Sequence, residues 1–297
     1  MARTLTRPTR PDRPDRPDRP DTVPELPEVE TIRRQLSPVW SGRRIVDAWT
    51  YGTPKFAAAV DAIGARVESI GRRGKYLMVE LDDDRQLVIH LGMTGVLRVG
   101  SGAEPDPYLR ASWSLDNETI VEFQDVRRFG RVAVVARDDH SSLPTLHALG
   151  PEPLSDDFTA ASLYRSLSAS HRAIKTQLLS QRPVAGVGNI YADEALWHAR
   201  VHPAARSITR PQATRLHTAI REVLAAAVER RGTTLRDYRT FSGERGDNQH
   251  ALVAYGQGDA PCARCARALR TITLDARTTT FCATCQRLPR ERRFDGA

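Results

Sequence analysis

The chain changes character at residues 150–153, Gly-Pro-Glu-Pro, and this change limits the folds that it can adopt. Before this junction, short β-rich runs alternate with turn residues. After it, longer segments with helical periodicity are separated by Pro and Gly. Short, regularly spaced strands predict a sandwich or barrel, whereas helical periods between breakers predict a packed helical unit. A chain of 297 residues is long enough for both. We therefore expect an α+β protein with a cleft between its two parts.

The expected strands all precede the junction, and most of the expected helices follow it. The β-rich runs cover residues 43–51, 76–81, 86–91, 96–99, 112–115, 119–123 and 131–135. Helical patterns cover residues 27–36, 158–167, 173–179, 189–198 and 212–230. The first of these helices is predicted to pack against the strands. Residues 239–250 are predicted to form a mobile polar loop.

The charge of the chain favours a polyanionic partner. The formal net charge is +8 and the pI is about 9.7. Residues 1–22 contribute six Arg and four Asp, so the remainder is still basic. Nucleic acid is the first candidate for such a protein. No run approaches the ~18 apolar residues of a membrane span, and the start of the chain does not resemble a signal peptide. We therefore expect a cytoplasmic protein.

The four cysteines predict a metal site. Cys262 and Cys265 form one C-x-x-C pair, and after sixteen residues Cys282 and Cys285 form another. This spacing suits one tetrahedral zinc ion on a β-hairpin, although two disulfides are the alternative. Four protein ligands leave no open position for a substrate, so the zinc would be structural. The hairpin between the pairs carries Arg277 on a stretch of Arg and Thr suited to phosphate.

Residues 1–22 combine Arg, Pro and Asp with almost no apolar side chain, so we expect them to be disordered. Two interpretations stay open. The segment is either a genuine tail that adds nonspecific attraction for DNA, or translated upstream sequence before a start at Val23. Removal of an initiating methionine at that position would leave Pro24 first in the chain. A terminal proline is a free secondary amine that can attack an electrophilic carbon, whereas an internal proline nitrogen is an amide.

The stretch after the leader, PELPEVE at residues 24–30, also has an ordinary interpretation. Apolar residues recur from Leu26 to Leu36 at helical spacing, and Pro27 suits a first helical turn. Glu28 and Glu30 favour the positive end of the helix dipole. Taken alone, the stretch therefore reads as the start of an amphipathic helix.

Four glycine-containing motifs carry side chains suited to DNA. GVGNIYADE at 186–194 predicts a helix start whose N–H groups and Asn189 seat a phosphate. RRGKY at 72–76 places three cations around a turn, with a solvated charge run as the alternative. HLGMTG at 90–95 and DVRRFG at 125–130 are tight turns that carry Met93 and Phe129. Such side chains usually belong to a core, but beside arginines they also serve as wedges that kink DNA.

Together and in this order, the motifs closely resemble those of bacterial formamidopyrimidine-DNA glycosylase from Pro24 to Arg287. The resemblance implies a base-excision repair enzyme that removes 8-oxoguanine and ring-opened purines from double-stranded DNA. It also implies cleavage of the abasic strand by β,δ-elimination. The expected protein is a cytoplasmic bacterial monomer associated with the nucleoid. The implied parts are an N-terminal β-sandwich catalytic domain with flanking helices, a helical helix-two-turn-helix domain and a C-terminal β-hairpin zinc finger. Their expected ranges are 24–140, 151–250 and 253–287, between the leader 1–23 and a basic tail 288–297.

The resemblance gives four residues catalytic roles. Pro24 corresponds to the amine that attacks C1′ and forms a Schiff base. Glu25 corresponds to the acid that protonates the sugar as its ring opens. Lys75 corresponds to the general acid/base of β-elimination, and Arg277 to the phosphate-gripping residue assigned to δ-elimination.

Other positions correspond to DNA contacts. Met93, Arg127 and Phe129 match the trio that fills the void after the damaged base is flipped out, with Arg127 facing the orphaned cytosine. His90 and Asn189 match phosphate contacts. Tyr108 and His171 stand where relatives carry a DNA-contacting His and Lys. The loop 239–250 lacks an aromatic residue expected after its second glycine, which leaves the preference among oxidised purines open.

Two rival functions remain. An endonuclease VIII-like glycosylase would prefer oxidised pyrimidines, but the turns at 90–95 and 127–130 argue against it. A noncatalytic damaged-DNA-binding protein would result if Pro24 stayed blocked. Glu25 and Lys75 beside an intact Pro24 argue against that degeneration.

Overall fold

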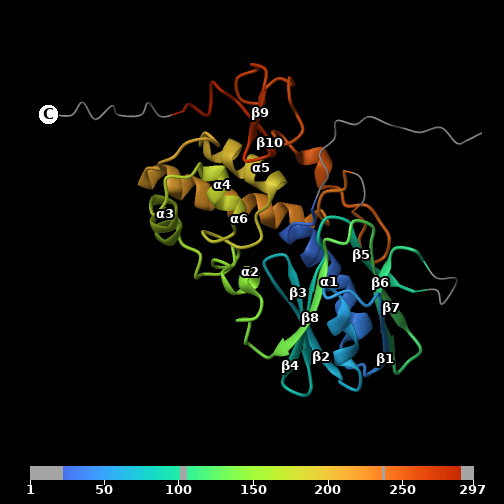
Figure 1. Ribbon diagram of the computed structural model, residues 1–297. Helices are drawn as coiled ribbons and strands as arrows, with labels where there is room; N and C mark the ends of the chain where they lie inside the picture. The colour runs from blue at the N-terminus through green and yellow to red at the C-terminus, as the bar shows by residue number, and fades with distance from the viewer. Residues whose placement is uncertain (1–22, 101–105, 236–237, 289–297) are drawn as a thin grey trace, which may run out of the picture.

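The computed structural model describes residues 23–100, 106–235 and 238–288. A β domain and a helical domain lie side by side, and a small hairpin module packs on the helical domain at the side away from the β domain (Figure 1). The expectations for residues 1–22 and for the tail beyond Leu288 lie outside the described residues. Among the described residues, no helix is long and apolar enough to cross a membrane.

The β domain is a sandwich of two antiparallel four-stranded sheets. The strand orders are β1-β6-β7-β5 and β2-β3-β4-β8. Their bounds are Ile45–Thr50 (β1), Val67–Arg73 (β2), Tyr76–Leu81 (β3), Arg85–His90 (β4), Gly95–Val99 (β5), Leu109–Leu115 (β6), Ile120–Asp125 (β7) and Arg131–Ala136 (β8). Alternate side chains fill the space between the sheets, including Trp113 and Phe123. The predicted sandwich is therefore confirmed.

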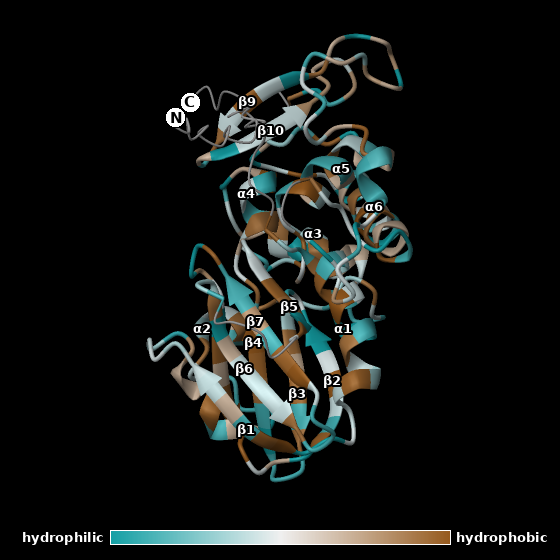
Figure 2. Ribbon diagram, turned by 90° about the vertical axis from the view of Figure 1, so that its right-hand side faces the viewer, coloured by the Kyte–Doolittle hydropathy of each residue, from teal (hydrophilic) through white to brown (hydrophobic). Residues whose placement is uncertain are grey.

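Helix α1 (Leu26–Trp40) belongs to both domains (Figure 2). A capping box between Glu25 and Glu28 starts it, with Pro27 in its first turn. Side chains from Val29 to Trp40 enter the sandwich core, whereas Leu26 packs in the core of the helical domain. The helix continues past the predicted end and through Pro38. Burial of Trp40 against Trp113, with ring centroids 5.3 Å apart, favours this extension.

The helical domain contains α3 (Ala160–Ser168), α4 (Ile174–Leu179), α5 (Asn189–Ala199) and α6 (Arg210–Glu229). Thr159 and Thr209 cap α3 and α6 with their side chains, and both complete a capping box. These bounds lie within two residues of the predicted helices. A short helix that was not predicted, α2 (Pro144–His147), packs Leu146 against the outer face of the second sheet.

Two segments differ from expectation. Strand β2 was not predicted because its sequence, VESIGRR, contains a glycine and three charges and buries only two side chains. Although this sequence has a low propensity for β structure, antiparallel pairing with β3 holds the segment in the sheet. The segment predicted as a polar loop also buries Phe241 in the sandwich core, next to Tyr238. Gln35 of α1 holds it further through hydrogen bonds with Ser242.

The hairpin module consists of β9 (Arg270–Leu274) and β10 (Arg277–Phe281), flanked by the two cysteine pairs. Its side towards the helical domain packs on α5, where Trp197 joins Cys262, Cys282 and Leu269 in one cluster. The predicted hairpin finger is therefore confirmed.

Candidate active site between the two domains

A cavity of about 580 Å³ is lined by residues of the β domain, the helical domain and the hairpin. Eight of the predicted site residues line it: Glu25, Lys75, His90, Met93, Arg127, Phe129, Asn189 and Arg277. Val23 and Glu25 line the same cavity, and Pro24, buried between them, is joined by an amide bond to Val23 in this chain. Residues spread over 250 positions of sequence thus converge on one site.

Glu25 is held at the N-terminus of α5. Its Oε2 accepts a hydrogen bond from the backbone N–H of Gly188 (2.6 Å), and its Oε1 accepts one from Ile190 (2.8 Å). The side chain is buried, and burial raises the pKa of Glu25 to about 7 against the opposing effect of Lys75. A carboxyl with this pKa can give up a proton near neutral pH.

Gly188 lets the side chains of Glu25 and Lys75 reach the start of α5. A Cβ added there would lie 2.6 Å from both Glu25 Oε1 and Lys75 Nζ. Position 188 therefore requires glycine, because the two side chains approach its backbone too closely for a Cβ atom. Lys75 is itself buried, and this burial lowers its pKa, although the carboxylates of Glu25 and Glu28 oppose the shift. A lysine with a lowered pKa is more often deprotonated at neutral pH than an exposed one, and only the neutral amine can accept a proton.

Glu28 is a buried residue that holds the segments around the site together. This role was not predicted from the sequence. Its carboxylate accepts hydrogen bonds from the backbone N–H of Glu25 (2.9 Å), the hydroxyl of Tyr191 (2.6 Å) and the N–H of Thr233 (2.7 Å). These bonds join α1, α5 and the segment after α6. In the sequence, the position of Glu28 in the first turn of a helix already explained its negative charge. No other feature of the sequence indicated that its carboxylate joins three segments.

His90 lies at the end of β4, and its ring packs at a tilt against that of Tyr76, with ring centroids 4.6 Å apart. Its Nδ1 accepts the backbone N–H of Gly92 (3.1 Å), which assigns the remaining proton to Nε2. Burial, helped by Lys75, lowers the pKa of His90 to about 4. The imidazole is therefore neutral at physiological pH and offers a hydrogen-bond donor rather than a positive charge.

Asp125 ties together the two turns that carry Met93 and Phe129. Its Oδ1 accepts the hydroxyl of Thr94 (2.6 Å), and its Oδ2 accepts the N–H of Gly130 (2.7 Å). Thr94 Oγ1 in turn accepts the N–H of Arg127 (3.0 Å). Phe129 is 49% exposed, so it projects from the turn and does not fill the core. The exposed wedge interpretation fits Phe129, whereas Met93 is partly buried.

The cations of the 72–76 turn divide between two roles. Arg72 forms ion pairs with Glu30 (3.2 Å) and Glu152 (2.8 Å), and Arg73 pairs with Glu152 (3.1 Å). These two arginines therefore connect β2 to α1 and to the junction between the domains. Of the three cations, only Lys75 lines the central cavity.

The hairpin is fixed to the helical domain beside Arg277. Lys175 of α4 and Asp193 of α5 form a buried ion pair at 2.7 Å. Lys175 Nζ also donates to the carbonyl of Thr278 (3.0 Å), and Asp193 accepts the N–H of Thr280 (2.9 Å). Asn189 Nδ2 donates to the same Thr278 carbonyl (3.3 Å). Arg277 is consequently placed at the mouth of the cavity.

The four cysteines fit a zinc ion. Their Sγ atoms lie within 4.8 Å of one another, and those of Cys265 and Cys282 are 3.5 Å apart. Tetrahedral coordination with Zn–S bonds of about 2.3 Å requires sulfur atoms about 3.8 Å apart. The cysteines are not joined as disulfides. The finger therefore holds one zinc ion, with a structural role.

Cys282→Ser is expected to lose the zinc ion and to weaken DNA binding, because the ligand set orders the hairpin that carries Arg277. The expected loss of affinity is roughly ten- to hundredfold, the size of one charge-assisted contact. Metal analysis and a binding titration measure both effects. Thr284→Ser, in the same turn, is the matched control. A zinc-free Cys282→Ser protein with normal affinity would contradict this placement of Arg277.

Two predicted DNA contacts lie away from the central cavity. Tyr108 is 47% exposed at the start of β6. His171 lines a separate hollow with Arg172 and Arg206, below the end of the β9–β10 hairpin. Both therefore remain predictions.

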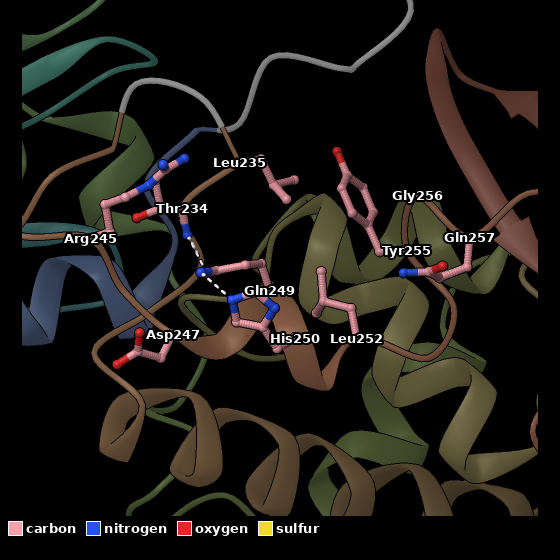
Figure 3. A pocket seen from close by; sticks show the side chains of 10 residues that line it. All are labelled: Thr234, Leu235, Arg245, Asp247, Gln249, His250, Leu252, Tyr255, Gly256 and Gln257. Atoms are coloured by element: carbon pink, nitrogen blue, oxygen red, sulfur yellow. Dashed lines mark hydrogen bonds between the residues drawn. The ribbon is translucent and has the colours of Figure 1, made fainter.

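Figure 3 shows the residues that line a second cavity of about 580 Å³. Polar side chains line it, and Gln249 accepts the N–H of Thr234 (3.1 Å) while its amide contacts His250. Tyr255 lines both cavities, so they adjoin at this residue. Neither Gln249 nor Tyr255 was singled out in the sequence, because isolated polar and aromatic residues carry no motif.

Comparison with known proteins identifies the three parts. Residues 23–132 match the formamidopyrimidine-DNA glycosylase N-terminal domain, residues 149–239 its H2TH domain, and residues 260–288 the zinc finger found in FPG and IleRS. Formamidopyrimidine-DNA glycosylase from Deinococcus radiodurans is 44% identical over 277 residues, which cover 89% of this chain and 97% of that protein. The Thermus thermophilus enzyme is 45% identical over 262 residues, covering 87% and 96%.

Solved structures agree. The crystal structure of MutM (FPG) from Thermus thermophilus superimposes with a TM-score of 0.83 at 44% identity, covering 90% of this chain and 100% of that one. A complex of Lactococcus lactis Fpg with abasic-site DNA gives a TM-score of 0.81 at 33% identity, covering 89% and 99%. Because domain order, cysteine site and fold all correspond over nearly the full length of these relatives, the chain belongs to the formamidopyrimidine-DNA glycosylase family.

Proposed function

We propose that this protein excises oxidised purines from double-stranded DNA and then cleaves the abasic strand as a lyase. The observation that carries the proposal is the buried pair of Glu25 and Lys75 next to Pro24, in a cavity rimmed by Arg127, Phe129 and Arg277. Two groups suited to proton transfer there adjoin the residue whose nitrogen would be the nucleophile once free, and the cations Arg127 and Arg277 and the aromatic ring of Phe129 surround them. The names of the relatives and the DNA in the solved complexes agree with this activity.

The working chain is proposed to begin at Pro24. The match to the family's N-terminal domain starts at residue 23, and Val23 and Glu25 both line the cavity. A free amine at Pro24 would have a pKa of roughly 7.7–8, so a useful fraction is unprotonated at neutral pH. Residues 1–23 would then be absent from the active enzyme.

The proposed chemistry assigns one step to each residue. The Pro24 nitrogen forms a bond to C1′, and the bond from C1′ to the base breaks with its electron pair leaving on the base. The resulting ammonium passes its proton to the departing base, and Glu25 protonates the ring oxygen O4′. The C1′–O4′ bond then breaks as the nitrogen lone pair forms the C1′=N bond of the iminium. Lys75 then removes a C2′ proton, which expels the 3′ phosphate. Arg277 grips phosphate during the second, δ, elimination.

The surrounding turns are proposed to hold the DNA open. C1′ and the base edges are inaccessible inside a stacked duplex, so the damaged nucleotide must flip out. Met93, Arg127 and Phe129 would fill the void, while neutral His90, together with Asn189, contacts phosphate. The second cavity, reached past Tyr255 and lined by Gln249 and His250, would receive the base (Figure 3).

A chain beginning at Pro24 is expected to excise 8-oxoguanine paired with cytosine, and formamidopyrimidines, at least roughly tenfold faster than oxidised pyrimidines, because a polar pocket built for one base edge rejects another. Single-turnover excision on duplexes that differ only in the lesion measures this ratio. Faster removal of oxidised pyrimidines would support the endonuclease VIII-like alternative. Tight binding without excision of any lesion would support the noncatalytic alternative. Sedimentation of the same protein tests the further proposal that it is a monomer.

A further inference from the structure

Trp197 places an unusual donor beside the cysteine site. It lies near the C-terminal end of α5, is only 4% exposed, and packs with Cys262 and Cys282. Its buried indole Nε1 makes no hydrogen bond of ordinary geometry within the described residues. Of the two cysteines packed with it, Cys262 is the one within reach of this N–H. A buried N–H without a good acceptor is unfavourable, so its persistence calls for a partner.

A metal-bound thiolate would be that partner. A thiol is a weak acceptor, whereas a cysteine bound to zinc carries negative charge and accepts hydrogen bonds more strongly. The indole N–H has no lone pair to offer the metal, so Trp197 can act on the site only as a donor to sulfur. Donors of this kind tune how tightly ligands hold a metal.

The ring of Trp197 is fixed in this orientation by Arg264. The guanidinium lies 3.6 Å from the centroid of the indole ring. Arg264 also donates to the backbone carbonyls of Trp197 and His198 (3.0 Å for His198), which are at the last turn of α5. Arg264 lies between Cys262 and Cys265, so the same turn of chain that carries two zinc ligands clamps the tryptophan.

We propose that Trp197 is a positioning residue that donates a hydrogen bond from Nε1–H to the zinc-bound Cys262 sulfur and thereby joins the metal site to α5. The same helix begins at Asn189 in the central cavity and holds the hairpin through Asp193. Asn189 and Trp197 are eight residues apart, about 12 Å along a rigid helix. The zinc ion is thus held at a fixed distance from the cavity that contains Arg277.

Trp197→Phe tests the proposal because it removes the N–H and keeps an aromatic ring for Arg264. The variant is expected to bind zinc about ten- to hundredfold more weakly, the usual effect of losing a partner of a metal ligand. Zinc transfer to a colorimetric chelator, followed on the whole chain, measures this directly. Trp49→Phe, an exposed tryptophan in β1, is the matched control. Equal zinc affinity for the two variants would overturn the proposal.

A second measurement needs no substitution. In the protein loaded with an NMR-active cadmium isotope, the indole proton of Trp197 is expected to show scalar coupling to the metal through the Cys262 sulfur. The indole proton of Trp49 should show none. A Trp197 indole resonance that is unsplit in the metal-loaded protein would refute the hydrogen bond even if Trp197→Phe failed to fold.

Discussion

A chain that begins at Pro24 is expected to form a covalent adduct when borohydride is added to it with a duplex containing one 8-oxoguanine, whereas the 297-residue chain with its leader intact is expected to form none. The physical reason is the state of one nitrogen. In the long chain the Pro24 nitrogen is a tertiary amide with no available lone pair, and only a free amine gives an iminium that borohydride reduces. The difference should be all or none on a denaturing gel.

Two controls make this result decisive. The long chain should still bind the duplex if its leader blocks only the chemistry. A chain starting at position 24 with Pro24→Gly should bind DNA but lose most base excision, because glycine offers a primary amine without the ring that orients it. Efficient trapping of the long chain with its leader still attached would place the nucleophile elsewhere. Unchanged turnover of Pro24→Gly would also contradict the assignment.

Glu25→Gln is expected to slow base excision by about 10²- to 10⁴-fold, the range usual for removal of a general acid. The amide can still accept a backbone N–H at the start of α5, so DNA binding should change little. Single-turnover rates on the 8-oxoguanine duplex measure the effect. Glu68→Gln, at an exposed position of β2, is the matched control. A rate within a few fold of the unmodified chain would remove Glu25 from the proton-transfer step.

The same substitution should change the pH profile of excision. Glu25 acts as an acid only while protonated, and because its pKa is raised to about 7, the rate should fall as pH rises through that region. Pro24 acts only while unprotonated, so the rate should also fall as pH drops below its roughly 7.7–8. The profile is therefore expected to be bell-shaped, and Glu25→Gln should retain the acidic limb and lose the alkaline one. An alkaline limb that survives in Glu25→Gln must come from another group.

The sequence predicts the residues of the candidate site that stand in recognisable motifs. It does not predict the buried residues that hold them in place. Lys75, Asn189 and Arg277 were found because each stands in a turn with glycine or beside cysteines, and such turns have few interpretations. Glu28 and Lys175 act through buried contacts with residues more than a hundred positions away. No local pattern records such partners. The cations at 72–76 are a similar case. They look alike in the sequence, and only the fold shows that Arg72 and Arg73 pair with glutamates whereas Lys75 lines the cavity.

The fold divides in a similar way. Most strands with alternating apolar residues and helices with caps were predicted to within two residues, because their stability has a local component. Strand β6 begins three residues before its predicted start, and α1 ends four residues after its predicted end. Strand β2 depends on its neighbour, and Phe241 is buried because a distant core lies under it. In both segments, contacts with residues distant in the sequence determine the structure.

The sharing of α1 between two cores has a consequence for how the protein is made. Leu26 packs in the helical core, and its backbone N–H donates to the carbonyl of Gly186 (3.1 Å). During synthesis from the N-terminus, the sandwich can therefore condense around the later turns of α1 while Leu26 still has nothing to bind. The N-terminal turn of α1, next to Pro24, can lock in place only after residue 186 has left the ribosome. The proposed catalytic centre is thus among the last features of the protein to assemble.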